Sequence, residues 1–140
     1  MEIKRAGKED FARLREIYFQ ARRERFTWLD PRDIKPEDFD SAVLGEDIYG
    51  AWIDGELAGF LTVWAPDRFL HLLFVDQHFR GRGVGGELVR TAARNYGLPL
   101  TLKCVKANQQ AAEFYLAHGW RIREEALCPE GPYYLMEYDK

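Results

Sequence analysis

The sequence is most informative at Arg80-Gly81-Arg82-Gly83-Val84-Gly85, a stretch that follows an apolar run and opens a helical one. The first backbone N–H groups of a helix have no partner within the helix, and the helix dipole places partial positive charge there. Glycines allow a phosphate to approach these groups without an intervening Cβ atom. The two arginines can add charge-assisted hydrogen bonds. The stretch therefore predicts a phosphate cradle; a tight turn with two solvated arginines is the simpler alternative.

Two other phosphate-binding motifs fit this stretch poorly. The spacing of Gly81, Gly83 and Gly86 matches the dinucleotide fingerprint, but that fingerprint lies directly after the first strand of a βαβ unit, and here residues 76–80 intervene. The acidic ribose ligand expected about 20 positions later is missing, because the next apolar run carries Lys103 and Lys106 instead. A nucleoside-triphosphate P-loop is excluded because no Lys-Ser/Thr pair follows the glycines.

Composition limits the class of protein. The chain has 140 residues, of which 46% are apolar and 31% charged, and this predicts a single domain spanning residues 1–140. A formal net charge of -3 gives no general attraction to nucleic acid or to an anionic membrane. The apolar runs are too short for a membrane span, and the first residues lack the apolar core of a secretory signal. Cys104 and Cys128 do not show metal-type spacing. We expect a cytoplasmic protein that binds no metal, no nucleic acid and no membrane.

The periodicity on either side of the glycines predicts alternating helices and strands. Apolar residues at helical spacing predict helices over 9–23, 36–44, 83–96 and 109–118. Short apolar runs predict strands over 3–6, 48–53, 57–64, 69–75, 100–105, 120–127 and 133–138. Asp54-Gly55 is a strong signal for a two-residue hairpin turn, because that turn needs positive φ. The resulting order, β-α-α-β-β-β-α-β-α-β-β, predicts a mixed α/β (α+β) layer architecture.

Two motifs in the correct order give the chain a clear resemblance to the GNAT superfamily of N-acetyltransferases. Arg80 to Gly85 fits the family's Arg/Gln-x-x-Gly-x-Gly/Ala signature. A second signature follows at the usual distance: Asn108-x-x-Ala111-x-x-Phe114-Tyr115-x-x-x-Gly119-Trp120. The order of predicted elements also matches, so that the resemblance covers essentially the whole chain.

The resemblance implies a mixed, mostly antiparallel sheet of six or seven strands, flanked by helices and splayed between the fourth strand (69–75) and the fifth (100–105). In such enzymes the pantetheine arm of acetyl-CoA lies in the gap like a missing strand, which is β-augmentation by a small molecule. Asn108 would contact this arm, although a helix N-cap is an equally ordinary role for it. The implied cofactor-binding residues are Phe74, Val75, Arg80, Gly81, Arg82, Gly83, Val84, Gly85, Asn108 and Tyr115.

Amine acylation by a thioester needs a neutral amine, a stabilised oxyanion and a proton for the departing thiolate. Tyr115 lies where the family places a general acid beside the CoA sulfur; the alternative is an aromatic residue of the core. Some members use a Glu on the fifth strand as the base, but here that position is Lys103, which departs from the pattern. His71 is the best remaining candidate, because it is polar within an apolar run and titrates near neutrality. Alternation along a strand would put it on the same face as Leu73 and Val75.

The resemblance implies transfer of acetyl directly from acetyl-CoA to a primary amine of a small molecule or peptide. Candidates for the acceptor side, besides His71, are Arg25, Trp28, Lys103 and Tyr133; a solvated helix end is the alternative for the arginine. Many relatives pair, so a homodimer is possible. The missing carboxylate at position 103 keeps open a second hypothesis, a non-catalytic acyl-CoA-binding sensor on the same fold.

Overall fold

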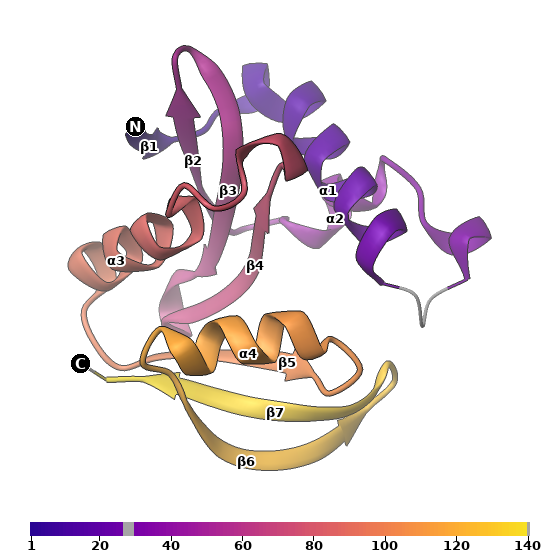
Figure 1. Ribbon diagram of the computed structural model, residues 1–140, viewed down its shortest axis with the longest axis vertical. Helices are drawn as coiled ribbons and strands as arrows, with labels where there is room; N and C mark the ends of the chain where they lie inside the picture. The colour runs from indigo at the N-terminus through magenta and orange to yellow at the C-terminus, as the bar shows by residue number, and fades with distance from the viewer. Residues whose placement is uncertain (27–29, 140) are drawn as a thin grey trace.

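The computed structural model describes residues 1–26 and 30–139 and contains a seven-stranded sheet (Figure 1). The strand order is β1-β2-β3-β4-β5-β7-β6, and only the β4–β5 pair is parallel. This confirms the mixed, mostly antiparallel sheet and fixes its strand number. The strands are β1 (Glu2–Arg5), β2 (Asp47–Ile53), β3 (Glu56–Trp64), β4 (Phe69–Val75), β5 (Leu100–Val105), β6 (Arg121–Cys128) and β7 (Gly131–Tyr138).

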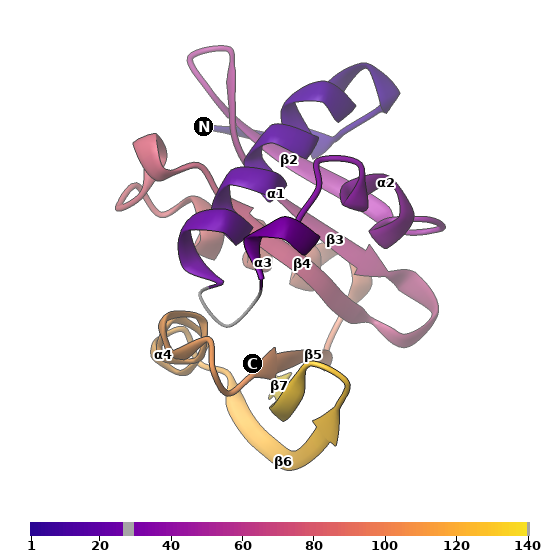
Figure 2. The same ribbon diagram turned by 90° about the vertical axis from the view of Figure 1, so that its right-hand side faces the viewer.

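Helices cover both faces of the sheet. α1 (Phe11–Arg25) and α2 (Asp38–Ala42) pack on one face, and α3 (Val84–Tyr96) and α4 (Gln109–Ala117) lie on the other (Figure 2). Four short 3-10 turns connect these elements: η1 (Lys8–Asp10), η2 (Pro31–Asp33), η3 (Ala65–Asp67) and η4 (Gln77–Phe79). None of the helices in the described part of the chain is long and apolar enough to cross a membrane.

Local sequence signals explain most element boundaries. The predicted hairpin turn joins β2 to β3 with φ of +50° at Asp54 and +81° at Gly55, as a two-residue turn between twisted strands requires. α3 buries the predicted stripe of Val84, Leu88, Val89 and Ala92. It ends at Gly97, whose φ of +80° is unfavourable for other residues.

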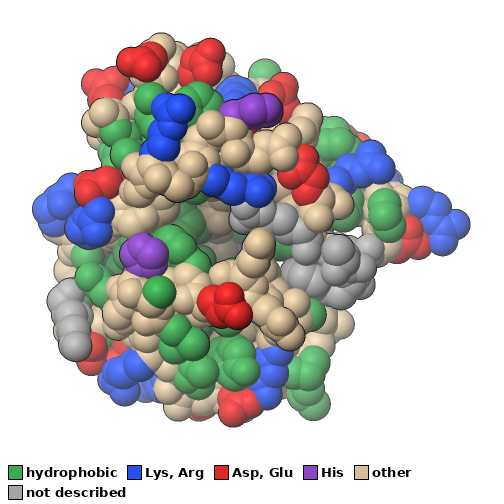
Figure 3. Space-filling model, in the orientation of Figure 1, with side chains coloured by type: hydrophobic (Ala, Val, Ile, Leu, Met, Phe, Trp, Pro, Cys, Tyr) green, Lys and Arg blue, Asp and Glu red, His purple; other side chains and the backbone are tan. Residues whose placement is uncertain are grey.

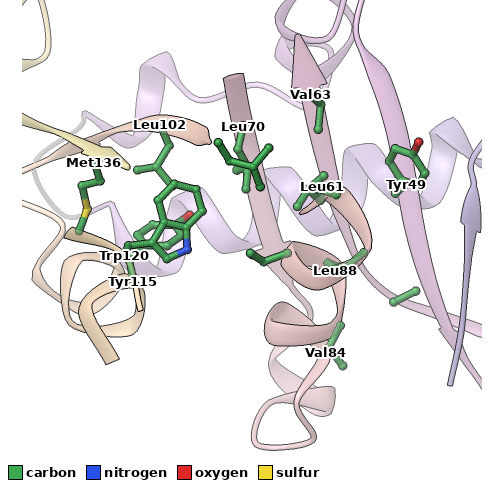
Figure 4. Close-up of a cluster of buried hydrophobic side chains, with 14 of the residues drawn as sticks. Tyr49, Leu61, Val63, Leu70, Val84, Leu88, Leu102, Tyr115, Trp120 and Met136 are labelled. Atoms are coloured by element: carbon green, nitrogen blue, oxygen red, sulfur yellow. The ribbon is translucent and has the colours of Figure 1, made fainter. Parts of the chain in front are cut away.

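Two apolar clusters hold the layers together. The larger joins α3 to the β1–β4 half of the sheet and α4 to the β5–β7 half, so that it continues across the splay (Figure 4). Leu61 and Leu88 belong to the first part, and Leu102, Trp120 and Met136 to the second. Because one cluster spans both halves, the two halves are fixed relative to each other although their strands diverge.

The smaller cluster lies under α1 and α2 and is centred on the ring of Phe39. This fully buried ring meets Phe11, Tyr18 and Phe60 edge-on, at centroid distances of 5.2, 6.0 and 5.5 Å. Edge-to-face pairs of this kind add about 0.5–1.5 kcal/mol each beyond the apolar area they bury. Phe39 therefore anchors the short helix α2 to the sheet.

The predicted splay between β4 and β5 is present. The two parallel strands are paired at one position only, Phe69 with Thr101. The Thr101 N–H donates a hydrogen bond to the Arg68 carbonyl at 3.1 Å. Beyond this point the strands separate, and the edge of β4 that faces β5 has no neighbouring strand. The unpaired backbone groups along this edge are available to an extended ligand.

A β-bulge in β4 overturns the alternation expected for His71. Val63 of β3 pairs with Leu70 and Thr62 pairs with Leu72, so that His71 is an extra residue on β4. Leu70 consequently packs in the larger cluster and Leu72 in the smaller one, on opposite faces. The Thr62 hydroxyl accepts a hydrogen bond from the Leu72 N–H at 3.1 Å and stabilises the irregularity. Bulges commonly redirect a side chain in this way.

Replacing Phe39 by Ala should lower the free energy of unfolding by about 3–5 kcal/mol, because the cavity left under α2 cannot close fully. Urea denaturation of the wild type and the variant measures this loss. Leu44 lies just after α2 and is 82% exposed, so Leu44→Ala is the matched control and should change stability by no more than about 0.5 kcal/mol. A loss at Phe39 similar to the control would show that α2 is not anchored by this ring.

Candidate active site

A cavity of about 490 Å³ lies at the splay, between the edge of β4, the start of α3 and the inner face of α4. The space-filling view shows the corresponding hollow between the surface over α3 and that over α4 (Figure 3). Nine of the ten residues predicted to bind the cofactor line this cavity. They are Phe74, Val75, Arg80, Gly81, Gly83, Val84, Gly85, Asn108 and Tyr115.

The loop between β4 and α3 is held in place by Asp76. Its carboxylate caps η4 by accepting a hydrogen bond from the His78 N–H at 2.8 Å and also pairs with Arg13 of α1 at 2.7 Å. Burial alone would raise the pKa of this carboxyl, but the hydrogen bonds from His78 and Arg13 outweigh it and the pKa is lowered. Asp76 therefore remains ionised and ties the glycine-rich turn to α1.

The glycines of the turn serve two different purposes. Gly81 and Gly83 have φ of +78° and +77°, and a Cβ atom at either would meet no atom within 4 Å. They are needed for the left-handed backbone that turns the following N–H groups toward the cavity. Gly85 has an ordinary φ, but a Cβ there would lie 3.0 Å from the Phe114 ring. Gly85 therefore allows α3 and α4 to approach each other across the cavity.

The two predicted phosphate arginines differ in position. Arg80 lines the cavity, and its guanidinium is 3.8 Å from the Glu24 carboxylate, too long for a strong hydrogen bond. Arg82 instead lies over the Phe79 ring at 5.4 Å and does not line the cavity. The fold thus directs one arginine of the motif to the site, and the other packs outside it.

Asn108 carries out the capping role that the sequence left as an alternative. Its side-chain oxygen accepts a hydrogen bond from the Ala111 N–H at 3.2 Å and caps α4. The side chain also lines the cavity. Since the cap uses the oxygen, the amide NH₂ group is left to donate to a ligand.

Tyr115 is buried in the wall of the cavity, with its ring edge-on to Phe114 and Trp120 at 5.4 and 5.5 Å. Its hydroxyl has no hydrogen bond to any other described residue. Burial, with a smaller contribution from the nearby Cys104, raises the pKa of this phenol far above its ordinary value. Tyr115 is therefore a protonated O–H donor facing the cavity at any physiological pH.

Cys104 lies behind Tyr115 in the larger apolar cluster. Burial raises the pKa of its thiol to about 11, so that the sulfur is neutral at physiological pH. A neutral buried thiol is a poor nucleophile, and Cys104 is a packing residue.

His71 does not line the cavity. Its Nδ1 atom lies 2.7 Å from an oxygen of Glu46, a residue in the connection between α2 and β2. The imidazole is partly exposed, beside the point at which β4 and β5 separate. The structure thus puts His71 outside the cavity, two residues before Leu73, the first β4 residue in the wall.

The residues predicted for the acceptor side are only partly brought together. Lys103 of β5 is exposed, with its ammonium 5.3 Å from the centre of the Tyr133 ring on β7. Neither residue lines the cavity. Arg25 ends α1, and its side chain lies outside what the structure describes, as does the whole of Trp28.

Several residues of the cavity wall were missed by sequence reasoning. Phe114 belongs to the second motif and could have been found there, and Gly86 and Phe79 adjoin the glycine-rich turn. His118 stacks on Phe114 at 4.1 Å, and Phe26 and Leu73 come from elements that no motif marks. The remaining missed residues are Gln110 and Ala111.

Comparison with known proteins identifies the family of the chain. Residues 11–120 match the acetyltransferase (GNAT) family. An N-acetyltransferase of Archaeoglobus fulgidus, described as uncharacterized, is 32% identical over 143 residues, covering 89% of this chain and 95% of the relative.

Solved structures share the fold. The apo form of YjaB from Escherichia coli superimposes with a TM-score of 0.83 at 22% identity, covering 98% of this chain and 96% of YjaB. The yncA protein of Salmonella typhimurium, solved with its cofactor acetyl-CoA, gives a TM-score of 0.72 at 16% identity, covering 99% of this chain and 93% of that one. The family match over residues 11–120 and the archaeal relative establish that the chain belongs to the GNAT family of N-acetyltransferases.

Proposed function

We propose that this protein transfers an acetyl group from acetyl-CoA directly to a primary amine of a small molecule or peptide. The observation that carries the proposal is the single cavity that joins the glycine-rich turn, the unpaired edge of β4 and the Tyr115 hydroxyl. A donor with a pyrophosphate at one end, amides in its arm and a thioester at the other end suits these three features in that order.

The donor end of the cavity fits a pyrophosphate and an amide-containing arm. The N–H groups at the start of α3 and the Arg80 side chain supply positive charge to the phosphates. The unpaired backbone of Phe74 and Val75 can pair with the amides of the arm, as a further strand would. The yncA protein, which shares this fold, holds acetyl-CoA.

Tyr115 and His71 are assigned complementary proton transfers. An alkyl ammonium has a pKa near ~10.4 and a thiol near ~8.5, so that removing the amine proton helps strongly at neutral pH and protonating the thiolate helps more modestly. His71 accepts the amine proton directly or through a water molecule, and Tyr115 donates to the departing sulfur. The new C–N bond forms as the C–S bond breaks, without a covalent enzyme intermediate.

The acceptor enters from the side of the sheet on which Lys103 and Tyr133 lie. The exposed Lys103 ammonium lies over the half-buried Tyr133 ring. An exposed lysine can pair with a negatively charged group near the amine of the acceptor, a contribution of about 0.2–1 kcal/mol. We include Arg25 and Trp28 in the acceptor region because the segment between α1 and α2 adjoins Phe26, which lines the cavity.

The decisive assay measures release of CoA thiol from acetyl-CoA with a panel of primary amines and peptides, and identifies the N-acetylated product by mass spectrometry. We expect turnover above hydrolysis with at least one amine of the panel. Tight binding of acetyl-CoA without turnover across a broad panel would contradict an enzymatic role.

Replacing Tyr115 by Phe should lower kcat by about 10²-fold, since general acid groups contribute about 10²–10⁴-fold. The affinity for acetyl-CoA should remain within about 2-fold, because the ring and its packing are preserved. Tyr138→Phe is the matched control: this ring packs on Trp120 at 5.4 Å but does not line the cavity, so kcat should not change. An affinity loss as large as the loss in kcat would make Tyr115 a binding residue.

Replacing Gly83 by Ala should weaken CoA binding about 10-fold, because a non-glycine residue loses about 1–2 kcal/mol in the left-handed conformation and the free turn relaxes out of it. Calorimetry measures the effect with CoA and with acetyl-pantetheine, which lacks the pyrophosphate and should bind the variant and the wild type equally. Gly55→Ala is the control, since Gly55 has φ of +81° and equally open surroundings far from the cavity. Equal losses for both ligands would separate Gly83 from phosphate binding.

A further inference from the structure

A buried carboxylate, that of Glu46, contacts the His71 imidazole, which lies two residues before the β4 part of the cavity wall. The Glu46 Oε2 atom is 2.7 Å from His71 Nδ1, which is a strong hydrogen bond between residues far apart in the chain. An ionised carboxylate can only accept hydrogen bonds, so that Nδ1 must carry the proton. The neutral imidazole then has its lone pair on Nε2, and this atom has no partner among the described residues.

The Glu46 side chain is buried, unlike the carboxylates of ordinary surface ion pairs. Its side chain is 9% exposed, and its second oxygen is fully buried without a hydrogen-bond partner in the described part of the chain. Within the same residues His71 is the only group with which it forms an ion pair. Burying a carboxylate with one unsatisfied oxygen costs stability. If this contact were purely structural, an apolar side chain at position 46 would give equal or greater stability.

The surroundings place the carboxylate on the side of the sheet covered by α1. Burial raises the pKa of the Tyr18 phenol, Arg22 opposes this, and the negative charges of Asp38 and Glu46 add to the rise. The Glu46 backbone is fixed as well, since its N–H donates to the Val43 carbonyl at 2.9 Å. The carboxylate is therefore held at a defined position facing His71.

A second histidine–carboxylate pair in the chain has different properties. His78 Nδ1 lies 2.9 Å from Asp76, but this imidazole is 78% exposed and the carboxylate also binds Arg13 and the His78 N–H. Asp76 thus has structural contacts that do not involve the His78 imidazole. In the described part of the chain, the Glu46 side chain has no contact of this kind besides the His71 imidazole. The Glu46–His71 pair is the one adapted to orient an imidazole.

The position of His71 relative to the cavity explains why the orientation of its imidazole would matter for the reaction. Leu73 is the first β4 residue of the wall, and it lies two residues after His71; two residues of a regular strand span about 7 Å. A donor anchored at Gly83 and lying along β4 ends near Leu73 and Tyr115. Its thioester would therefore lie beside His71, at the end of the cavity opposite the glycine-rich turn.

We propose that Glu46 is a positioning residue that fixes the Nδ1–H form of His71, so that Nε2 accepts the proton of the attacking amine. This inference rests on the proposed acetyl transfer. In the step, the amine nitrogen bonds to the acetyl carbon, the C–S bond breaks, and the amine proton moves to Nε2 and then to water. The sulfur takes a proton from Tyr115, which water replaces. The Glu46 carboxylate keeps its hydrogen bond to Nδ1 and holds the ring in place as the charge of the imidazole changes.

The tautomer is measured directly by long-range ¹H–¹⁵N NMR of the imidazoles, which needs no acceptor. The chain has three histidines, and substituting each in turn assigns their signals. Neutral His71 should be in the Nδ1–H form in the wild type, largely so in Glu46→Gln, and a mixture in Glu46→Met, which keeps the bulk of the side chain without an acceptor. An unchanged tautomer in Glu46→Met would overturn the proposal.

A double-mutant cycle tests the consequence for catalysis. Glu46→Met should lower kcat about 10-fold or more as part of a general-base contribution of about 10²–10⁴-fold, and Glu46→Gln should restore part of it. In a His71→Ala background, Glu46→Met should change kcat by no more than about 2-fold. Equal losses in both backgrounds would reduce Glu46 to a structural residue and overturn the proposal.

Two controls separate this proposal from the proposed function. Acetyl-CoA affinity and the thermal unfolding midpoint of each variant report folding and donor binding, and His78→Ala, an exposed histidine outside the cavity, should leave kcat unchanged. Absence of turnover by the wild type with every amine would contradict acetyl transfer itself. Turnover that persists in His71→Ala would leave acetyl transfer standing and overturn the role of Glu46.

Discussion

The one-sided pairing of β4 is the constraint on which the rest of the structure depends. β3 pairs with β4 along its length, whereas β5 meets it only at Phe69. Backbone N–H and C=O groups need partners when they leave water, and each one buried without a partner costs about 1–3 kcal/mol. The backbone groups on the free edge of β4 must therefore form hydrogen bonds with water or with a ligand. A cavity at this edge follows from the topology, and its lining decides what the ligand is.

Packing between the helices keeps the gap open at a defined width. The larger apolar cluster continues from α3 to α4 and supports both halves of the sheet. Small residues set the distances: Gly85 faces the Phe114 ring across the cavity, and a Cβ atom at Gly59 would lie 2.8 Å from the Phe74 carbonyl oxygen. The glycine at 59 allows β4 and α3 to pack closely against β3. The cavity is thus shaped by a rigid, fully packed surround, as a site that orients two reactants requires.

The sequence predicted the helices and strands well because their signals are local. Period and turn chemistry located every helix and strand to within a few residues, and nine of the ten residues predicted to bind the cofactor line one cavity. The insertion of β7 between β5 and β6 depends on pairing between distant residues. His71 was misplaced because a bulge, which no residue pattern announces, interrupts the alternation of β4. Glu46 was missed since its partner is 25 residues away in the chain and meets it only in the fold. Arg82 fits the motif but packs on Phe79.

Of the two groups assigned to proton transfer, the proposed acid Tyr115 is buried and the proposed base His71 is partly exposed, as their proposed roles require. Tyr115, in the cavity wall, is 8% exposed, whereas the His71 side chain is 37% exposed. A group that protonates the departing sulfur meets only the donor, which is already in the cavity, and burial keeps its proton in place. A group that takes the amine proton must be reached by an acceptor arriving from solvent and must return that proton to water. We therefore infer that the buried carboxylate of Glu46 compensates for this exposure, because an imidazole open to solvent has no other contact that would select one of its two tautomers.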